Sequence, residues 1–234
     1  MLFVRSLLYW LVLVISTILF SILLIPLYLM PFYVRIRMDR AWIHINLSAL
    51  KYLCKLDYQV EGLENLPEKN AIFLAKHQSA WETIAFQAFL PPLSWVLKQE
   101  LLRIPFFGWG LACMEPVAID RKAGRQALNH MIKQGSTRLK QGRWLMIFPE
   151  GTRTAPGKKA IYHPGAGLLA QKTHSPIVPI AHNAGLYWPR RGFIKHPGTI
   201  RVVIGPCMPT TGMKAKEIVK MAEEWIENKV IELS

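Results

Sequence analysis

The chain has 234 residues, of which 51% are apolar, 19% charged and 11% aromatic. This composition supports a substantial buried core and excludes a disordered polar chain. A balance of 29 Lys and Arg against 15 Asp and Glu gives a net charge of +14. That charge predicts an acidic partner, either nucleic acid or an anionic membrane. The three cysteines, Cys54, Cys113 and Cys207, are widely separated. Their spacing argues against a disulfide scaffold or a cysteine-rich zinc module and favours a reducing compartment.

The N-terminal segment is apolar over a length that suits a membrane. No charged residue occurs between Arg5 and Arg35, and residues 7–29 are almost all apolar or aromatic. About 20 such residues are enough for a helix to cross the hydrocarbon core, and no signal-peptide cleavage site follows them. Membrane insertion is therefore favoured over a buried helix. Because Pro26 and Pro31 interrupt a straight helix, two arrangements remain open: a spanning helix, or a helix that enters one leaflet and turns at the prolines.

Basic residues follow this apolar segment more densely than they precede it. Arg35, Arg37 and Arg40 stand on the C-terminal side, against Arg5 on the other. The positive-inside rule then places the rest of the chain on the cytoplasmic side. A helix is predicted over residues 41–55, either packed on a core or lying on lipid headgroups. We therefore divide the chain into an N-terminal membrane-anchoring helical segment, 1–57, and an α/β domain, 58–234.

Short apolar runs alternate with amphipathic stretches through the second part. The runs predict strands at residues 71–75, 94–97, 117–119, 145–148, 177–180 and 200–204. The amphipathic stretches predict helices at 81–90, 125–140, 165–172 and 214–231. This alternation is typical of an α/β fold with a single mixed, largely parallel sheet flanked by helices. Ligands of such sheets bind beyond the carboxyl ends of the strands.

The end of the first predicted strand carries a histidine and an acid. His77 follows the strand, Ser79 is a candidate helix cap, and Glu82 falls in the helix that comes next. Five residues rotate about 140° on a helix, so the two side chains meet only if His77 lies in the turn and Glu82 reaches back. The carboxylate then keeps one imidazole nitrogen protonated and leaves the other free to accept a proton. Taken alone, such a pair is more often a surface histidine near a helix cap.

Three further segments end predicted strands. In Phe148-Pro149-Glu150-Gly151-Thr152-Arg153, the glycine permits close approach of a ligand and the arginine offers a planar fork for phosphate. The glutamate there is suited to accept hydrogen bonds from hydroxyls. Another strand ends at Asp120 and Arg121. A fourth runs from Ile177 to Asn183, and its Pro179 favours an edge strand or a strand end.

These four segments, in this order, resemble the glycerophospholipid acyltransferase family over roughly residues 62–208, and within it the bacterial 1-acyl-sn-glycerol-3-phosphate acyltransferases. The family usually carries His-x4-Asp, where this chain has His77 and Glu82. The resemblance implies transfer of an acyl chain from acyl-CoA or acyl-carrier protein to the sn-2 hydroxyl of lysophosphatidic acid, which forms phosphatidic acid in phospholipid biosynthesis. It also implies a bacterial inner-membrane location, with residues 58–234 as the acyltransferase catalytic domain on the cytoplasmic side.

Roles for individual residues follow from the same resemblance. His77 is the expected general base and Glu82 the acid that orients it. The expected substrate-binding residues share the ends of predicted strands: Glu150, Gly151, Thr152, Arg153, Arg121 and Lys98. The hydrophobic cluster at 104–109 is a candidate lining for an acyl tunnel, although ordinary core packing is the simpler interpretation of each side chain. No metal and no bound cofactor are expected. The expected partners are the membrane lipid acceptor, the thioester donor and an anionic membrane.

Several alternatives remain at this stage. The acceptor can be another lysophospholipid or glycerol 3-phosphate, and the chain can also be a catalytically silent membrane interaction protein on the same fold. Nucleic-acid binding is disfavoured by the long uncharged N-terminal run and by the lack of a nucleic-acid motif. A serine hydrolase is disfavoured because no G-x-S-x-G sequence occurs.

Overall fold

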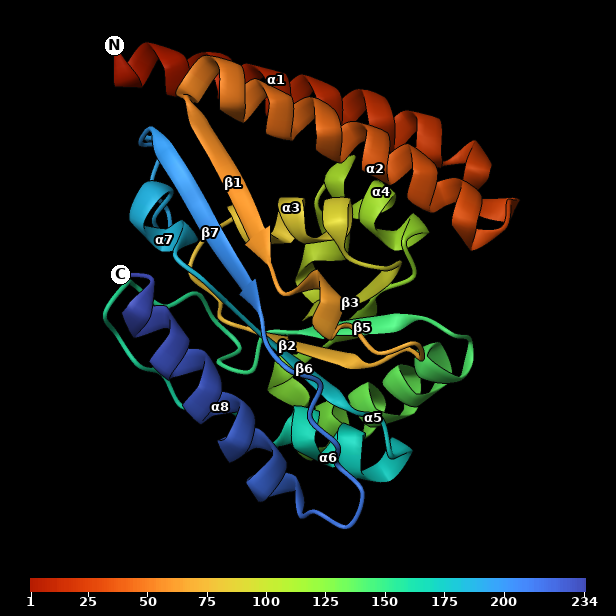
Figure 1. Ribbon diagram of the computed structural model, residues 1–234. Coiled ribbons are helices and arrows are strands. Elements are labelled where there is room, and N and C mark those ends of the chain that lie inside the picture. Colours follow the sequence, from red (N-terminus) through yellow and green to blue (C-terminus); the bar gives the residue numbers. More distant parts are fainter.

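The apolar runs form one seven-stranded sheet in the computed structural model, which describes residues 1–234 (Figure 1). The strand order is β1-β7-β6-β2-β5-β3-β4. The five strands from β6 to β4 are mutually parallel, whereas β7 is antiparallel to β6 and parallel to β1. The predicted single, mixed and largely parallel sheet is thus confirmed. The strands are β1 Leu56–Glu61, β2 Ile72–Ala75, β3 Leu93–Lys98, β4 Val117–Ile119, β5 Trp144–Ile147, β6 Ile177–His182 and β7 Gly198–Ile204.

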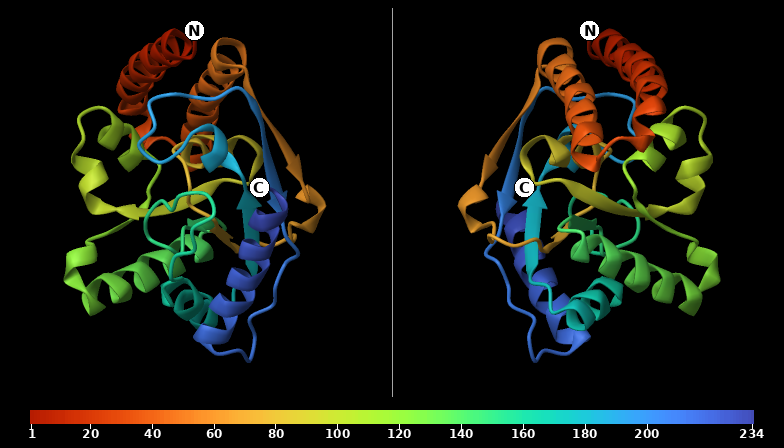
Figure 2. Two further views of the ribbon diagram at one scale, coloured as in Figure 1. Left: turned by 90° about the vertical axis from the view of Figure 1, so that its left-hand side faces the viewer. Right: turned by 90° about the vertical axis from the view of Figure 1, so that its right-hand side faces the viewer.

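Helices cover both faces of the sheet (Figure 2). The α-helices are α1 Leu2–Leu24, α2 Phe32–Ala49, α3 Trp81–Phe89, α4 Phe107–Cys113, α5 Arg125–Lys140, α6 Gly165–Thr173, α7 Ala184–Tyr187 and α8 Ala215–Glu232. Every strand and helix predicted in the α/β part is present, with ends that differ by at most two residues. The prediction missed β1, because this edge strand leaves Gln59 and Glu61 exposed and lacks a continuous apolar run. It also missed the short helices α4 and α7.

The sheet separates two apolar cores. Successive residues of a strand point to opposite faces, and β2 illustrates the consequence. Phe73 and Ala75 pack in the core shared with α2 and α3, whereas Ile72 and Leu74 pack in the core shared with α5, α6 and α8. All four side chains are fully buried. A strand covered on both faces explains why this part of the sequence is continuously apolar rather than alternating.

The N-terminal segment is a helical hairpin that packs on the α/β domain. The helix α1 ends before a 3-10 turn, Pro26–Leu29, and α2 runs back beside α1 (Figure 1). The helix predicted at 41–55 begins nine residues earlier than expected, at Phe32, because Pro31 is the N-cap of the helix and not part of an irregular segment before it. Its last part, Leu50–Cys54, is a π-helical turn. Tyr9 and Ile43 belong to the same core as the sheet, so the hairpin and the domain share buried surface.

Two of the three arginines expected at the membrane flank bind the domain instead. Arg35 is buried, and its guanidinium lies 2.5 Å from Glu115 Oε1 and donates to the carbonyl of Cys113. Arg40 donates to the carbonyls of Gln87 and Leu90 at the end of α3. Arg35 and Arg40 therefore fasten the hairpin to the domain.

The position of Pro179 differs from the expectation of an edge strand or a strand end. It is the third residue of β6, which lies in the interior of the sheet between β7 and β2. A proline is tolerated there because the side of β6 that bears its nitrogen faces the end of β7. The carbonyl of Pro179 accepts from the N–H of Gly205, just beyond β7, and antiparallel pairing with β7 begins only at Ile180. No ladder hydrogen bond to β2 is lost.

The outer face of α1 presents apolar side chains to the surroundings. This helix is the one helix of the structure that is both long and apolar enough to cross a membrane. Its exposed large side chains include Leu7, Leu8, Trp10, Leu11, Val14, Ile15, Leu19, Ile22 and Leu23. An exposed apolar face of this extent is unusual on a soluble monomer and marks a surface for membrane or protein contact. It favours association of the hairpin with a membrane.

Charges on this face should release the protein from membranes without unfolding it. Leu11 and Ile15 are 50% and 56% exposed, and a lysine at the centre of a membrane helix costs about 2.5–3.5 kcal/mol. We expect the double variant Leu11→Lys, Ile15→Lys to move from the membrane pellet to the soluble fraction with little change in thermal unfolding. A lysine at Ile231, which is 65% exposed on α8, is the matched control and should leave fractionation unchanged. Full membrane retention of the double variant would contradict the assignment of this face.

Candidate functional site

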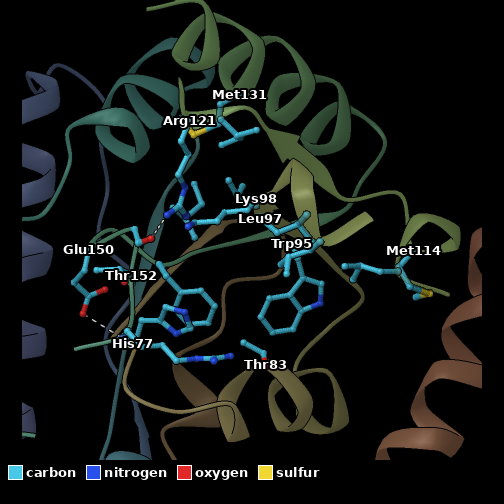
Figure 3. Close-up of a pocket in the computed structure, with 18 of the residues that line it drawn as sticks. His77, Thr83, Trp95, Leu97, Lys98, Met114, Arg121, Met131, Glu150 and Thr152 are labelled. Atoms are coloured by element: carbon cyan, nitrogen blue, oxygen red, sulfur yellow. Dashed lines mark hydrogen bonds between the residues drawn. The ribbon is translucent and has the colours of Figure 1, made fainter. Parts of the chain in front are cut away.

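The predicted site residues converge at one edge of the sheet. Because β2, β5, β3 and β4 are parallel, the segments that follow them meet at their carboxyl ends. A cavity of about 960 Å³ opens there (Figure 3). The predicted residues that line it are His77, Lys98, Arg121, Glu150, Gly151, Thr152 and Arg153. Glu82 lies behind His77, fully buried at the start of α3.

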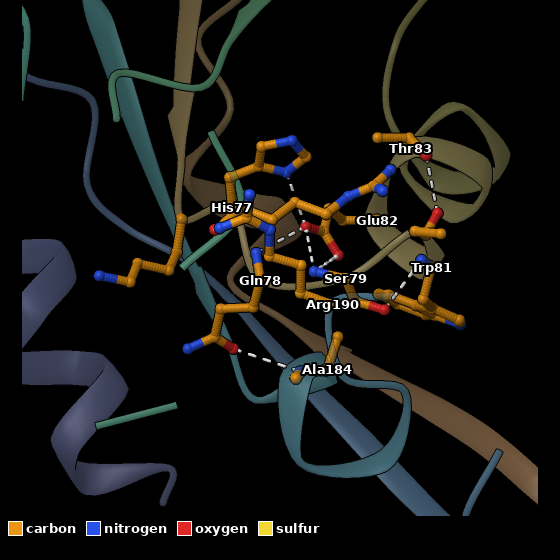
Figure 4. A network of polar contacts seen from close by, with 12 residues as sticks. His77, Gln78, Ser79, Trp81, Glu82, Thr83, Ala184 and Arg190 are labelled. Atoms are coloured by element: carbon orange, nitrogen blue, oxygen red, sulfur yellow. Dashed lines mark hydrogen bonds and ion pairs between the residues drawn. The ribbon is translucent and has the colours of Figure 1, made fainter. Parts of the chain in front are cut away.

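The imidazole of His77 is fixed from two sides. Its Nδ1 lies 2.9 Å from Glu82 Oε1 (Figure 4). Because an ionised carboxylate can only accept, Nδ1 carries a proton, and in the neutral imidazole the lone pair of Nε2 is then free. The ring also stacks on Phe148, with centroids 4.0 Å apart. The contact predicted from the turn-and-helix argument is therefore present, and the longer acid of this chain reaches the histidine.

The Glu82 carboxylate is held by the backbone of the same turn. It accepts the N–H groups of Gln78 and Ser79 at 2.8 Å, in addition to the bond from His77. Burial opposes ionisation, yet the nearby His182 and the bonds from His77 and Ser79 hold the pKa of Glu82 below its usual value. The predicted cap of α3 was one residue off: Ala80 is the N-cap, and the hydroxyl of Ser79 accepts the N–H of Trp81 from the position before it. A charged and immobile carboxylate is thus available to orient the imidazole.

The turn after β5 closes against the same histidine. Gly151 has φ +67°, the left-handed conformation that favours glycine, and its carbonyl accepts from the Arg121 guanidinium. The N–H of Thr154 donates to the carbonyl of His77 at 2.7 Å. The two predicted motifs are therefore hydrogen-bonded to each other, and the turn at 148–154 is one wall of the cavity.

Glu150 differs in orientation from the residue predicted to meet substrate hydroxyls. Its side chain is fully buried, and Oε1 accepts the backbone N–H of His77 at 3.1 Å (Figure 3). The ammonium of Lys76 lies 3.7 Å from the same oxygen, and Oε2 has no hydrogen-bond partner. Burial raises the pKa of Glu150 to about 7. This carboxyl group supports the loop that carries His77.

Basic side chains surround the cavity more completely than the sequence indicated. Lys98 is the last residue of β3 and Arg121 follows β4. Arg153 lies in the turn after β5, with its Nε buried and unpaired. Arg190 and Arg191 also line the cavity, and Arg190 donates to the carbonyl of Arg153 at 2.9 Å. These two arginines were missed. Their signal was available, because they follow β6, whose carboxyl end lies on the same edge of the sheet.

The cavity continues into an apolar arm beneath the N-terminal hairpin. Phe20 and Leu24 of α1 and Trp42 of α2 line it, together with Leu111 and Met114 near α4. Among the hydrophobic cluster predicted at 104–109, only Phe107 lines the cavity. Trp109 is instead 46% exposed, because α4 packs against α1 through Gly110 and turns it outward, and Ile104, which precedes α4, is 44% exposed. One cavity therefore joins a basic end beside His77 to a largely apolar end beside the hairpin, whose lining also includes Asp39 of α2.

Comparison with known proteins places this site in a family. Residues 57–183 match the family model described as Acyltransferase. The chain is 45% identical over 210 residues to a 1-acyl-sn-glycerol-3-phosphate acyltransferase of Pseudomonas aeruginosa, across 88% of this chain and 82% of that protein. The chain belongs to the acyltransferase family. His77, Glu82 and the turn at 148–154 all lie inside the matched residues, whereas Arg190 and Arg191 lie beyond them.

Two further comparisons agree with this assignment. A 1-acyl-sn-glycerol-3-phosphate acyltransferase of Saccharomyces cerevisiae is 31% identical over 185 residues, which cover 75% of this chain and 59% of the yeast protein. The crystal structure of the 1-acyl-sn-glycerophosphate acyltransferase PlsC from Thermotoga maritima superposes with a TM-score of 0.81 at 23% identity, across 98% of this chain and 95% of that one. The acyltransferase therefore has the PlsC fold, including its helical N-terminus.

The buried Glu150 of this acyltransferase predicts a pH-dependent stability. Its raised pKa means that folding favours the protonated form. The stability from this group is therefore complete below the pKa of an unfolded glutamate and is lost as the pH rises through about 7. Glutamine cannot ionise, so the free energy of unfolding of Glu150→Gln, relative to that of the wild type, should rise by about 1–3 kcal/mol from pH 5 to pH 8. Chemical unfolding of both proteins at the two pH values measures this, and Glu64→Gln, at an exposed position, is the control. A stability difference between variant and wild type that is the same at both pH values would contradict the prediction.

Proposed function

We propose that this acyltransferase transfers an acyl chain from acyl-CoA or acyl-carrier protein to the sn-2 hydroxyl of lysophosphatidic acid. The observation that carries the proposal is the position of His77, whose acid-oriented imidazole lines the same cavity as the basic turn at 148–154. The names of the relatives from Pseudomonas aeruginosa and Saccharomyces cerevisiae support this substrate. The apolar arm beneath the hairpin suits an acyl chain, and the basic end suits a phosphate.

In the proposed reaction, His77 Nε2 accepts the proton of the sn-2 hydroxyl as its oxygen attacks the thioester carbonyl carbon. Glu82 stabilises the imidazolium that forms, because its carboxylate is already bonded to Nδ1. The tetrahedral intermediate then collapses, the C–S bond breaks, and the imidazolium returns its proton to the leaving thiolate. The products are phosphatidic acid and the free thiol of the carrier. General-base catalysis of this kind contributes about 10²–10⁴-fold, and the alignment of two bound substrates adds to it.

The acceptor phosphate is assigned to the basic end of the cavity. Arg153 offers a planar guanidinium whose Nε has no partner within the protein. Lys98 and Arg121 reach the same cavity from the ends of neighbouring strands, as does Thr152 from the turn after β5 (Figure 3). Gly151 completes that turn. We assign no metal and no bound cofactor to this reaction. The exposed face of α1 would hold the cavity at the membrane surface, where the lipid acceptor resides, with the domain on the cytoplasmic side where thioester donors are found.

Replacing His77 tests the base. We expect His77→Ala to reduce kcat by at least about 10²-fold, because no other group in the structure bonds Glu82 and also lines the cavity. Folding and membrane association should be retained, since the buried Glu82 still accepts the backbone N–H groups of Gln78 and Ser79. Acyl transfer from purified protein, measured with both thioester donors and a panel of lysolipids and glycerol 3-phosphate, gives the rate and identifies the acceptor. Activity equal to that of the wild type would refute the assignment of His77.

Replacing Arg153 tests the phosphate site. A bidentate arginine–phosphate contact is lost in Arg153→Ala, so the KM for lysophosphatidic acid should rise by about tenfold or more. The KM for monoacylglycerol, which has no phosphate, should change much less. Lys172→Ala, at the end of α6 and outside the cavity, is the matched cationic control. An equal loss with both acceptors would show that Arg153 has only a structural role.

A further inference from the structure

A buried ion pair joins the C-terminal helix to the histidine loop. Lys76 stands between β2 and His77 and is 1% exposed. Its ammonium lies 2.5 Å from Glu227 Oε1 on α8 and 3.7 Å from Glu150 Oε1. Both glutamates are also buried. A charge removed from water to this extent needs a partner of opposite sign, so one cation stands between two carboxyl groups.

The same contacts continue to the peptide of the histidine. Glu150 Oε1 accepts the N–H of His77, and the N–H of Thr154 donates to the carbonyl of His77. The backbone of Lys76 is held in turn, because its carbonyl accepts from Nε2 of His182 at 2.8 Å. The place of the imidazole in the cavity thus depends on a carboxyl group whose nearest cation is Lys76.

The charge on Glu150 is set by groups from three elements. Lys76 at the end of β2 favours the carboxylate, whereas Glu227 on α8 opposes it and is the closer partner of that lysine. Tyr162, in the loop before α6, donates its hydroxyl to Glu227 at 3.0 Å, and Glu223 of α8 lies near that phenol. With two carboxyl groups sharing one ammonium, burial raises the pKa of Glu150 to about 7. The ionisation of this group is therefore responsive to any change at Lys76 or Glu227.

Stability alone gives little reason for such an arrangement. Apolar side chains of similar volume often stabilise a fold as well as a buried ion pair does or better. A cation at residue 76, unlike an apolar side chain, adds to the backbone N–H groups of Glu150 and His77 in favouring a charged Glu150. Only a charged acceptor makes a charge-assisted bond to the N–H of His77. The free-energy cost of burying these charges is offset by the charge-assisted bond that holds the loop carrying the imidazole.

We propose that Lys76 and Glu227 are positioning residues for acyl transfer: their ion pair controls the charge of Glu150, and the charged Glu150 fixes the backbone of His77. This rests on the proposed function, in which His77 is the base. Lys76 and Glu227 touch no substrate. They act through Glu150, and the form of the enzyme with Glu150 ionised is the active one.

Two substitutions should then move the acidic limb of the profile of kcat/KM against pH in opposite directions. Glu227→Gln keeps an oxygen for Lys76 and Tyr162 but removes a negative charge at most about 6 Å from Glu150. The limb should move to lower pH by roughly one to two units, as expected for a single charge at this distance. Lys76→Met removes the cation, so the limb should move to higher pH and activity at pH 7 should fall by about tenfold or more.

The matched control is Glu224→Gln, which removes the same charge one turn earlier on α8, where the side chain is 64% exposed. It should leave the profile unchanged. A second series repeats Glu227→Gln in a Glu150→Gln background, where no ionisation remains for Glu227 to influence. There the activity should be lower at every pH, because the charged acceptor is lost, and Glu227→Gln should leave the remaining profile unchanged. Thermal unfolding of every variant shows that the profiles come from folded protein.

The wild-type assay separates this proposal from the proposed function. If the wild-type protein acylates no acceptor, the proposed function itself is contradicted. An active wild type whose Glu227→Gln variant keeps the original limb, or shifts it equally in the Glu150→Gln background, would overturn the positioning role alone. If Lys76→Met does not fold, the Glu227 series and its double variant decide the question by themselves.

Discussion

A carboxylate that is buried away from water needs hydrogen-bond donors from the protein. The site is built around one such group, the carboxylate of Glu82, whose donors are all supplied by the adjacent turn. Glu82 is fully buried and accepts two backbone N–H groups and the imidazole of His77. These donors belong to consecutive residues 77–79, so satisfying the carboxylate forces the backbone out of the strand and delays the helix until Trp81. The direction of the imidazole follows from this turn. The ring is held at the sheet edge by the electrostatic needs of a buried acid rather than by packing alone.

The topology of the sheet brings the other chemical groups to this imidazole. Parallel strands β2, β5, β3 and β4 deliver their following loops to one edge, and His77 is bonded there to residues 150 and 154, more than 70 positions away along the chain. The strands β7 and β1 run the other way and contribute no residue to the cavity. They extend the sheet beneath the hairpin instead, where Ile200 and Val202 share a core with Tyr9 of α1. The sheet thus supports the N-terminal helices and the cavity as one unit.

Local patterns in the sequence were enough to predict which residues lie at the carboxyl edge of the sheet. They were not enough to predict which residues far apart in the chain contact each other. Continuous apolar runs predicted the buried strands, and the polar residues after them predicted His77, Glu82 and the turn at 148–154. The interior position of Pro179 depends on where β7 ends, which no local pattern records. The burial of Glu150 depends on Lys76 and on Glu227, 151 residues further along the chain from that lysine. Arg35 and Arg40 show the same limit, because basic residues beside an apolar segment look alike whether they face lipid headgroups or bind the carbonyls of another helix.

Part of the net charge of +14 is concentrated at one end of the cavity. Its basic end carries Arg121, Arg153 and Arg190, and its other end is lined by Phe20 and Trp42 of the hairpin. A single-chain lysolipid has the same polarity, with an anionic headgroup at one end and hydrocarbon at the other. Under the proposed function, an acceptor that leaves the bilayer beside α1 moves its phosphate toward the arginines without removing its chain from an apolar environment. The desolvation of the chain then costs little, and the ion pairs at the headgroup set the distance between the sn-2 hydroxyl and His77.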